Sequence, residues 1–168
     1  MSIYDSTVGS YTKMLKNLDK WLEAAEAYAK KKNFDPNVLV QARLAPDQYP
    51  FVRQVQSACD SAKTAGARLA GKEPPSHPDT EQTMEELHGR VRKVIKYLEE
   101  LPRKDYEGAE TRAIALPFLE GKKISGDHYT YELSVPNFFF HLVHCYAILR
   151  HNGVELGKQD YIGSLTLQ

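Results

Sequence analysis

The stretch PNFFFHLVHCYAILRHNG, residues 136–153, decides the fold because it has the composition and the boundaries of a buried helix. It is apolar on almost every side, Pro136 stands in its first turn, and Gly153 follows its last turn. Proline just inside the start and glycine just past the end are the usual boundaries of a helix. We therefore predict a helix that opens at Ser134 or Pro136 and closes at Gly153. We also expect it to be the most buried helix of the molecule.

Three further segments show the apolar period of a helix, with steps of three and four residues between their apolar positions. They run from about Asp5 to Lys31, from Asp47 or Pro50 to just before Gly71, and from Thr80 or Thr83 to Leu101. Most apolar residues of the second segment are small, so a neighbouring helix can approach it closely. Four amphipathic helices predict an all-α four-helix bundle, formed by residues 1–168 as a single domain.

Two long connections separate the predicted helices. Residues 72–79 contain three prolines, so they form a linker rather than a helix. Residues 103–135 lack a helical period, and they predict a small two-strand β-hairpin around Gly121 to Gly126, between helices three and four. An excursion of this length often serves as a lid or a pocket wall. Either connection allows a long crossover, so the sequence leaves the topology open. The tail, residues 154–168, is expected to wrap over the surface.

The composition argues against several classes of function. The chain has 168 residues, and 22 Lys and Arg balance 22 Asp and Glu, which gives a formal net charge of zero. This balance argues against nucleic acid as the main partner and against a membrane surface. We find neither a signal peptide nor an apolar stretch long enough to span a bilayer. We therefore expect a cytoplasmic protein in which Cys59 and Cys145 are reduced.

The histidines of residues 136–153 are the first candidates for chemistry. In a helix, Asn137, His141, His144 and His151 share one stripe. Because His141 and His144 are three residues apart, both could bind one metal ion if another helix supplied a further ligand. The candidates for that ligand are Asp47, Asp60 and His88. The structural alternative is that these imidazoles face solvent or form hydrogen bonds within the bundle, since two histidines at this spacing are a weak motif.

A second group of polar residues borders the apolar stripe of the second helix. Asp47, Gln54, Ser61 and Arg68 recur every seven residues, and the simplest interpretation of this group is a solvated face. Arg43 stands just before the helix, where its guanidinium and free backbone N–H groups could hold an anion. The favoured alternative is an Arg43–Asp47 ion pair that only fastens the loop.

Several motifs together resemble one known family. They are RLAPD at residues 43–47, CDSAK at 59–63, PNFFFH at 136–141 and AILRHNGV at 147–154. The combination resembles an uncharacterised domain-of-unknown-function family within the DinB/YfiT-like metalloenzyme superfamily, and the resemblance covers essentially the whole chain. It implies a DinB/YfiT-like four-helix bundle with one long crossover, often as a homodimer. Better-known members use three histidines to hold a divalent metal, usually zinc or nickel, and some of them transfer thiols or open small electrophiles.

The metal site of this superfamily matches the chain only in part. Its last helix supplies two histidines four residues apart; His141 matches the second, and Asn137 stands in the place of the first. The third histidine is expected near the start of the second helix, where residues 46–49 contain none. The resemblance therefore carries the fold but not the usual three-histidine site. If a divalent metal is bound, the candidate ligands are His141, His144 and Asp47, and the alternative is that no metal is bound.

These residues are compatible with three functions. The first is a small-molecule enzyme, either a degenerate metal-dependent transferase or hydrolase, or a metal-free enzyme in which His141 is the general acid or base. The second is a ligand-binding protein without catalysis, and the third is a dimeric structural or interaction protein without metal. In the metal-free case, His141→Ala should abolish binding of the small-molecule ligand without unfolding the protein. The predicted catalytic residues are His141, Asp47 and Asn137. The predicted ligand-binding residues are Arg43, Gln54, Tyr129 and His144.

Overall fold

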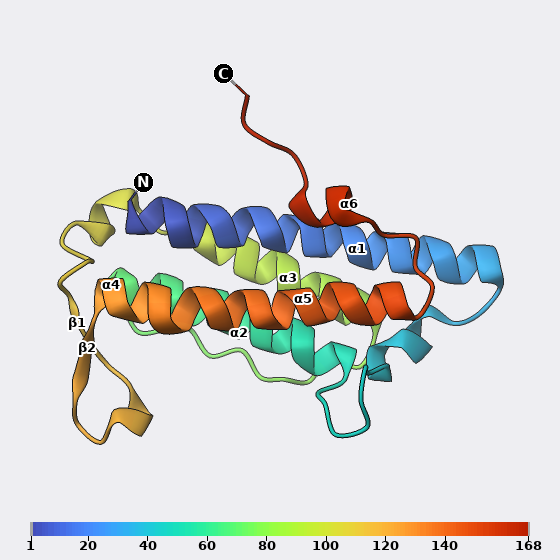
Figure 1. The fold of residues 1–168 in the computed structure, drawn as a ribbon, viewed down its shortest axis with the longest axis horizontal. Coiled ribbons are helices and arrows are strands. Elements are labelled where there is room, and N and C mark those ends of the chain that lie inside the picture. Colours follow the sequence, from blue (N-terminus) through green and yellow to red (C-terminus); the bar gives the residue numbers. More distant parts are fainter. Residues whose placement is uncertain (1, 168) are drawn as a thin grey trace.

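A computed structural model describes residues 2–167 and shows a bundle of four long helices (Figure 1). The helices are α1 (Ser10–Lys32, preceded by a π-helical turn at Asp5–Gly9), α2 (Phe51–Leu69), α3 (Met84–Glu99) and α5 (Val135–His151). Helices α1 and α5 run in one direction, and α2 and α3 run in the other (Figure 1). Helix α2 packs against both α3 and α5, and α1 packs against the same two helices. The predicted four-helix bundle is confirmed.

The apolar stripes predicted from the sequence meet in one core. The largest fully buried side chains include Trp21, Tyr11, Phe51 and Phe138. Helices α2 and α3 approach closely at Gly66, where an added Cβ would lie 2.8 Å from Cδ2 of Leu98. The small residues of α2 therefore allow the close packing that the sequence predicts.

The connections between the first three helices follow local sequence rules. Between α1 and α2, a 3-10 helix (Pro36–Gln41) is capped by the side chain of Asp35. Residues 72–82 contain neither helix nor strand, and they run along the length of the bundle (Figure 1). This linker is the long crossover. Thr83 ends it as the N-cap of α3, in a capping box with Glu86.

Arg90 of α3 ties the crossover to the bundle. Its side chain is 2% exposed and forms ion pairs with Asp60 of α2 at 2.8 Å, and with Asp79 and Glu81 of the linker at 3.1 Å each. A guanidinium has several donors in a fixed plane, so one Arg90 can hold three carboxylates in place.

The predicted β-hairpin lies at one end of the bundle (Figure 1). Strand β1 (Ala113–Ala115) pairs antiparallel with β2 (Lys123–Ser125), and Ile114 faces Ile124. Two 3-10 helices, Arg103–Tyr106 and Pro117–Leu119, lie before and within the hairpin. The hairpin therefore fills most of the excursion between α3 and the fourth helix.

The fourth helix begins at Gly126, which corrects the predicted start at Ser134 or Pro136. It consists of α4 (Gly126–His128), a π-helical segment (Tyr129–Ser134) and then α5. A proline inside a regular α-helix clashes with the carbonyl four residues before it. The wider π-helical turns directly before Pro136 relieve that clash, so the proline lies within the helical run.

Helix α5 is not the most buried helix, contrary to the expectation. Phe140 is 53% exposed and Val143 is 45% exposed. Helix α5 packs mainly on α1 and α2, so its outer face is left without a helix over it. Helix α2 is the most buried instead, because neighbours flank it on several sides.

The tail follows the surface as predicted as far as a short helix, α6 (Lys158–Ile162), which packs on α1. The described residues after α6 project away from the bundle instead (Figure 1). The indole N–H of Trp21 donates a hydrogen bond to the Asp160 carbonyl at 3.0 Å, and the ring of Tyr161 stacks on that of Trp21. These contacts fix the tail to the bundle.

Both cysteines match the expectation for reduced thiols. Cys59 and Cys145 are buried and free, and burial raises the pKa of the Cys59 thiol to about 12. In the part of the chain that the structure describes, no helix has the length and apolar character needed to cross a bilayer.

Candidate functional site

Three hydrogen-bonded pairs line the contact between α2 and α5, and we call this line the α2–α5 seam. Gln48 and His144 are 2.8 Å apart, Gln54 and His141 are 2.9 Å apart, and Ser61 and Asn137 are 2.6 Å apart. Because α2 and α5 are antiparallel (Figure 1), the residue numbers of the pairs rise from 48 to 61 on the α2 side while they fall from 144 to 137 on α5. The seam brings together four of the predicted site residues: Gln54, Asn137, His141 and His144.

His141 is a neutral imidazole with one free nitrogen. Its Nδ1 lies 2.9 Å from Oε1 of Gln54, which can only accept a hydrogen bond, so Nδ1 carries the proton. Burial lowers the pKa of His141, and the neighbouring His144 and Arg53 lower it further. Among the described residues, Nε2 has no hydrogen-bond partner, so it is available as a base or as an acceptor.

His144 is fully engaged by its neighbours. Its Nδ1 lies 2.6 Å from the Phe140 carbonyl oxygen and must therefore donate to it. Its Nε2 then accepts a hydrogen bond from the side-chain amide of Gln48 at 2.8 Å. Neither nitrogen of His144 is left for a metal ion.

A pocket of about 360 Å³ opens beside the seam next to Asn137. It is lined by Asp60, Ser61, Thr64, Arg68, Phe118, Tyr129, Leu133, Ser134 and Asn137. The Ser61 hydroxyl accepts from the side-chain amide of Asn137 and donates to the Ser57 carbonyl at 2.7 Å. Within residues 2–167, Oδ1 of Asn137 has no hydrogen-bond partner, so it can accept from a ligand. The predicted ligand-binding residue Tyr129 is 3% exposed and forms the far wall of this seam pocket.

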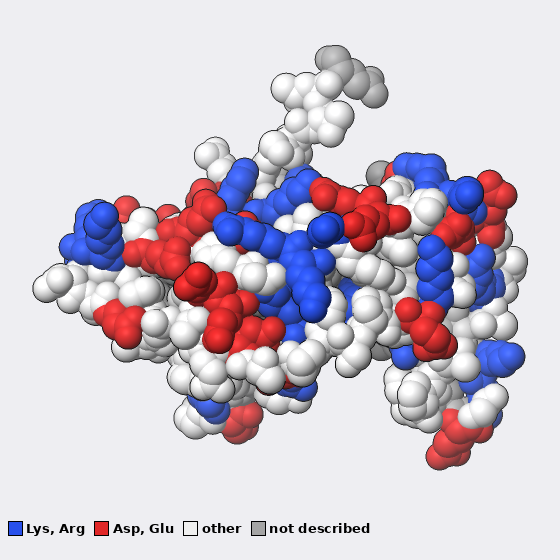
Figure 2. Space-filling model, turned by 180° about the vertical axis from the view of Figure 1, so that it is seen from behind, with Lys and Arg blue, Asp and Glu red and all other residues white. Residues whose placement is uncertain are grey.

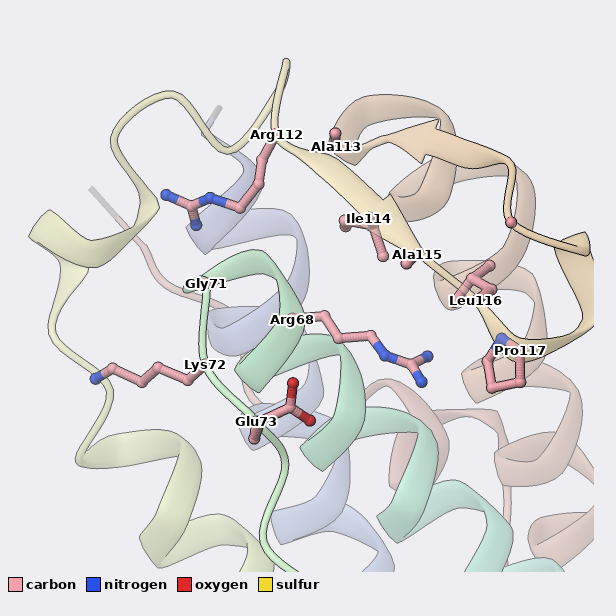
Figure 3. A pocket seen from close by; sticks show the side chains of 11 residues that line it. Arg68, Gly71, Lys72, Glu73, Arg112, Ala113, Ile114, Ala115, Leu116 and Pro117 are labelled. Carbon is pink, nitrogen blue, oxygen red and sulfur yellow. The ribbon is translucent and has the colours of Figure 1, made fainter.

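A second pocket, of about 580 Å³, lies between the end of α2 and β1 (Figure 3). Arg68 lines this pocket as well as the seam pocket, and its side chain reaches toward Pro117 (Figure 3). Arg112 serves the fold instead, because it donates to the backbone carbonyls of Leu69 and Asp105. The hairpin thus forms a wall of both pockets, as expected for the long excursion.

The structure leaves Arg43 and Asp47 outside the seam. Both lie exposed in the loop before α2. The guanidinium of Arg43 donates to the Pro46 carbonyl at 3.1 Å. Among the described residues, Arg43 and Asp47 do not form the ion pair that was the favoured alternative. The hydrogen bond from Arg43 to the backbone fastens this loop instead.

The other candidate metal ligands are engaged elsewhere. His88 contacts Asp19 at 2.5 Å on the opposite side of the bundle, and Asp60 pairs with Lys63 and Arg90. His151 is exposed at the end of α5. No three His, Cys, Asp or Glu side chains within residues 2–167 are placed to hold a metal ion. The residues present therefore do not fit the three-ligand site, and the set of His141, His144 and Asp47 is not assembled.

The face in Figure 2 lies behind the view of Figure 1, and it mixes acidic and basic side chains. Several charged side chains of α1 and α3 pair with each other: Arg92 lies 2.9 Å from Asp19 and 3.6 Å from Glu23, and Lys16 lies 2.6 Å from Glu99. These exposed pairs add little to stability. Because these charged side chains already pair with each other, we take the seam between α2 and α5 as the better candidate site.

Sequence reasoning missed part of the seam. Ser61 and Arg68 belong to the group of polar residues that recurs every seven residues. The simplest interpretation of that group from the sequence is a solvated face. Gln54 and Ser61 of that group instead face α5, and Arg68 lines the seam pocket. The spacing of seven residues was the signal, because it keeps side chains along one side of a helix. No motif in the sequence identifies Phe118 as a residue of the pocket wall.

The four-helix bundle, the long crossover between the parallel helices α2 and α3, and the polar seam define a DinB-like helical protein. The model of the family described as "Domain of unknown function (DUF1993)" matches residues 3–162, and the chain belongs to this family. A crystal structure of a DinB family member from Shewanella denitrificans is 45% identical in sequence, with a TM-score of 0.94. The match covers 98% of this chain and 94% of that one. No functionally curated protein matches the chain.

Proposed function

We propose that this protein binds a small organic molecule in the seam pocket, without a metal ion held by three side chains. The observation that carries the proposal is the pocket beside Asn137, which lies where α2 and α5 face each other. Known ligand sites combine apolar walls with a few convergent polar groups. The seam pocket has both: Phe118 and Leu133 supply apolar wall, and Ser61, Tyr129 and Asn137 supply polar groups.

Acid–base catalysis by His141 is an extension of this proposal. His141 stands one helical turn beyond Asn137, a rise of about 6 Å along α5. A ligand that extends past Asn137 would meet the free Nε2 of His141, which is neutral and suited to accept a proton. His141 is not among the residues that line the seam pocket, so we no longer expect its replacement to abolish binding. His141→Gln should leave binding intact but stop conversion of the ligand, and NMR of the ligand's own resonances over several hours measures the conversion.

Binding is tested with a defined panel of small aromatic molecules: benzoate, benzamide, phenyl phosphate and phenol. Their rings match the apolar wall, and the pocket volume of about 360 Å³ is sufficient to hold them. Ligand-observed NMR titrations are run on the whole chain in the presence of EDTA. The test variant is Ser61→Ala/Asn137→Ala. The matched control is His151→Ala, which changes an exposed residue of the same helix.

We expect at least one panel member to bind the wild type in EDTA, and to bind the double variant about tenfold more weakly. The control should bind as the wild type does. Because the Ser61–Asn137 pair is exposed, its loss should cost no more than about 1 kcal/mol of stability. The proposal fails if no member binds, or if the double variant binds as tightly as the wild type.

The alternative function is that of a dimeric interaction protein. The specific observation in its favour is the uncovered outer face of α5, where Phe140 and Val143 are about half exposed. Apolar side chains gathered on one helix face are typical of protein contacts. This alternative does not exclude ligand binding, because the pocket lies on the hairpin side of Asn137, away from Phe140.

A further inference from the structure

We propose that the seam pocket recognises an anionic group, a carboxylate or a phosphate, and that Arg68 is the residue that binds it. This inference rests on the proposed function and names the chemical class of the ligand. Its basis is a partly buried arginine that lines two pockets and has no acidic partner among the described residues.

Arg68 differs from the other arginines that are at least partly buried. Arg53 pairs with Asp79, Arg90 binds three carboxylates, and Arg112 donates to backbone carbonyls. Arg68 alone of these four has neither a carboxylate nor a backbone carbonyl as a hydrogen-bond partner in the described part of the chain. Partial burial without a counter-charge is costly for a guanidinium, and a bound anion would remove that cost.

The surroundings of Arg68 suit a ligand with a ring and an anionic end. Arg68 lies beside Tyr129: burial raises the pKa of that phenol, and the guanidinium partly offsets the rise. The Tyr129 hydroxyl therefore stays protonated near neutral pH and can donate to the same anion. Phe118 and Leu133 offer apolar contact to the rest of the ligand.

Two carboxylates line pockets that Arg68 also lines, so both must be considered as its partners. Asp60 lines the seam pocket, but it already pairs with Lys63 at 2.7 Å and with Arg90 at 2.8 Å. Glu73 lines the neighbouring pocket (Figure 3) and is exposed, and the ion pairs of the described residues do not include one between Glu73 and Arg68. The position opposite Arg68 is therefore open to an anion from outside the chain.

The test compares anions with uncharged molecules of the same shape. Benzoate is paired with benzamide, and phenyl phosphate with phenol, all at constant ionic strength because salt screens charge. The proteins are the wild type, Arg68→Gln, Arg68→Lys and Arg150→Gln. Arg150 is a matched control, because it also stands in the last turn of its helix and is exposed.

We expect at least one anion to bind the wild type about tenfold more tightly than its uncharged partner. Arg68→Gln should remove this preference, Arg68→Lys should keep part of it, and Arg150→Gln should keep all of it. A preference for benzoate alone or for phenyl phosphate alone supports the inference and identifies the group. All three arginine variants should unfold at the temperature of the wild type within a few degrees, measured by circular dichroism.

The possible failures are distinguishable. If the uncharged partners bind as tightly as the anions, or if Arg68→Gln keeps the preference, the pocket stands and the role of Arg68 is refuted. If no panel member binds, both this inference and the proposed function are refuted. If the preference survives in Arg68→Gln but disappears in Arg150→Gln, the anion binds at another surface and the inference is overturned.

Discussion

His141 has surroundings that keep its imidazole neutral and oriented. Gln54 fixes the proton on Nδ1, and partial burial disfavours the charged ring. His128 has the opposite surroundings, because it is exposed and Glu132 raises its pKa. The two histidines lie in one helical run, so the difference arises from their neighbours and not from the helix.

The first prediction concerns the titration of His141. Its pKa in the folded protein should lie below the ordinary value of 6.5, whereas that of His128 should lie above it. Two-dimensional NMR of the histidine ring C–H groups, assigned with His141→Gln and His128→Gln, measures both. A His141 midpoint at or above 6.5 would contradict the described surroundings.

The same shift makes stability depend on pH. Because folding lowers the pKa of His141, the unfolded chain binds the proton more readily than the folded one. The contribution of His141 to stability is therefore present above pH 6.5 and is lost as pH falls toward its folded pKa. Urea unfolding of the wild type and His141→Gln between pH 7 and 5 should show a smaller loss on acidification for the variant. Equal losses would contradict this sign.

At the scale of elements, Gly126 marks the junction between the hairpin and the fourth helix. A Cβ added there would lie 1.8 Å from the backbone carbonyl oxygen of Ala109. A backbone atom cannot rotate away as a side chain can, so the junction would have to open. The start of the helix therefore depends on this close approach of two backbones.

The second prediction compares two glycine substitutions. Gly126→Ala should destabilise the protein by about 3 kcal/mol, because overpacking against backbone has no easy relief. Gly89→Ala should be neutral or stabilising by about 0.5–1 kcal/mol, because Gly89 lies within α3 and nothing stands within 4 Å of its Cβ position. Urea denaturation measures both, and equal effects would refute the described junction.

Periodicity and caps predicted most of the fold, because both are local properties of the chain. The four apolar stripes, the proline-containing linker and the hairpin were all predicted and are all present in the structure. The start of the fourth helix was not predicted, because Pro136 follows a π-helical segment that the apolar pattern does not reveal. Proline is common at helix starts, and that preference gave the wrong boundary.

The site was predicted mainly on the α5 side of the seam, and Gln54 is the predicted residue that lies on α2. Asn137, His141 and His144 share a stripe by helix geometry alone. Their partners on and before α2 depend on how far the two helices slide past each other, which packing decides. Hydrogen bonds to Phe140 and Gln48 occupy His144, and rotamer choices of this kind are not readable from spacing.

For the whole molecule, the third prediction concerns the oligomeric state. We expect a homodimer through the outer face of α5, with twice the 19.1 kDa mass of one chain in light scattering. Phe140→Ser/Val143→Ser should give single chains, because exposed apolar area drives association. The control Val38→Ser changes an equally exposed apolar residue in another part of the fold and should stay dimeric. A wild-type mass of one chain would refute this prediction.

At the scale of the whole molecule, we propose a DinB-like bundle that binds its ligand in the seam pocket without a metal site of three side-chain ligands. The crossover and the hairpin contribute to this arrangement in different ways. Arg90 holds the crossover against α2 and α3, while the hairpin supplies Phe118 to the wall of the pocket. Binding of an organic molecule in EDTA is therefore the central claim.

The most direct test is a protein-observed ¹H–¹⁵N NMR titration, in EDTA, with the tightest-binding member of the panel. We predict saturable shifts of the Asn137 side-chain amide and of the backbone amides of Ser61, Thr64 and Tyr129, with Arg150 unchanged. The account is contradicted if those resonances do not move, or if they move only after Zn²⁺ or Ni²⁺ replaces the EDTA.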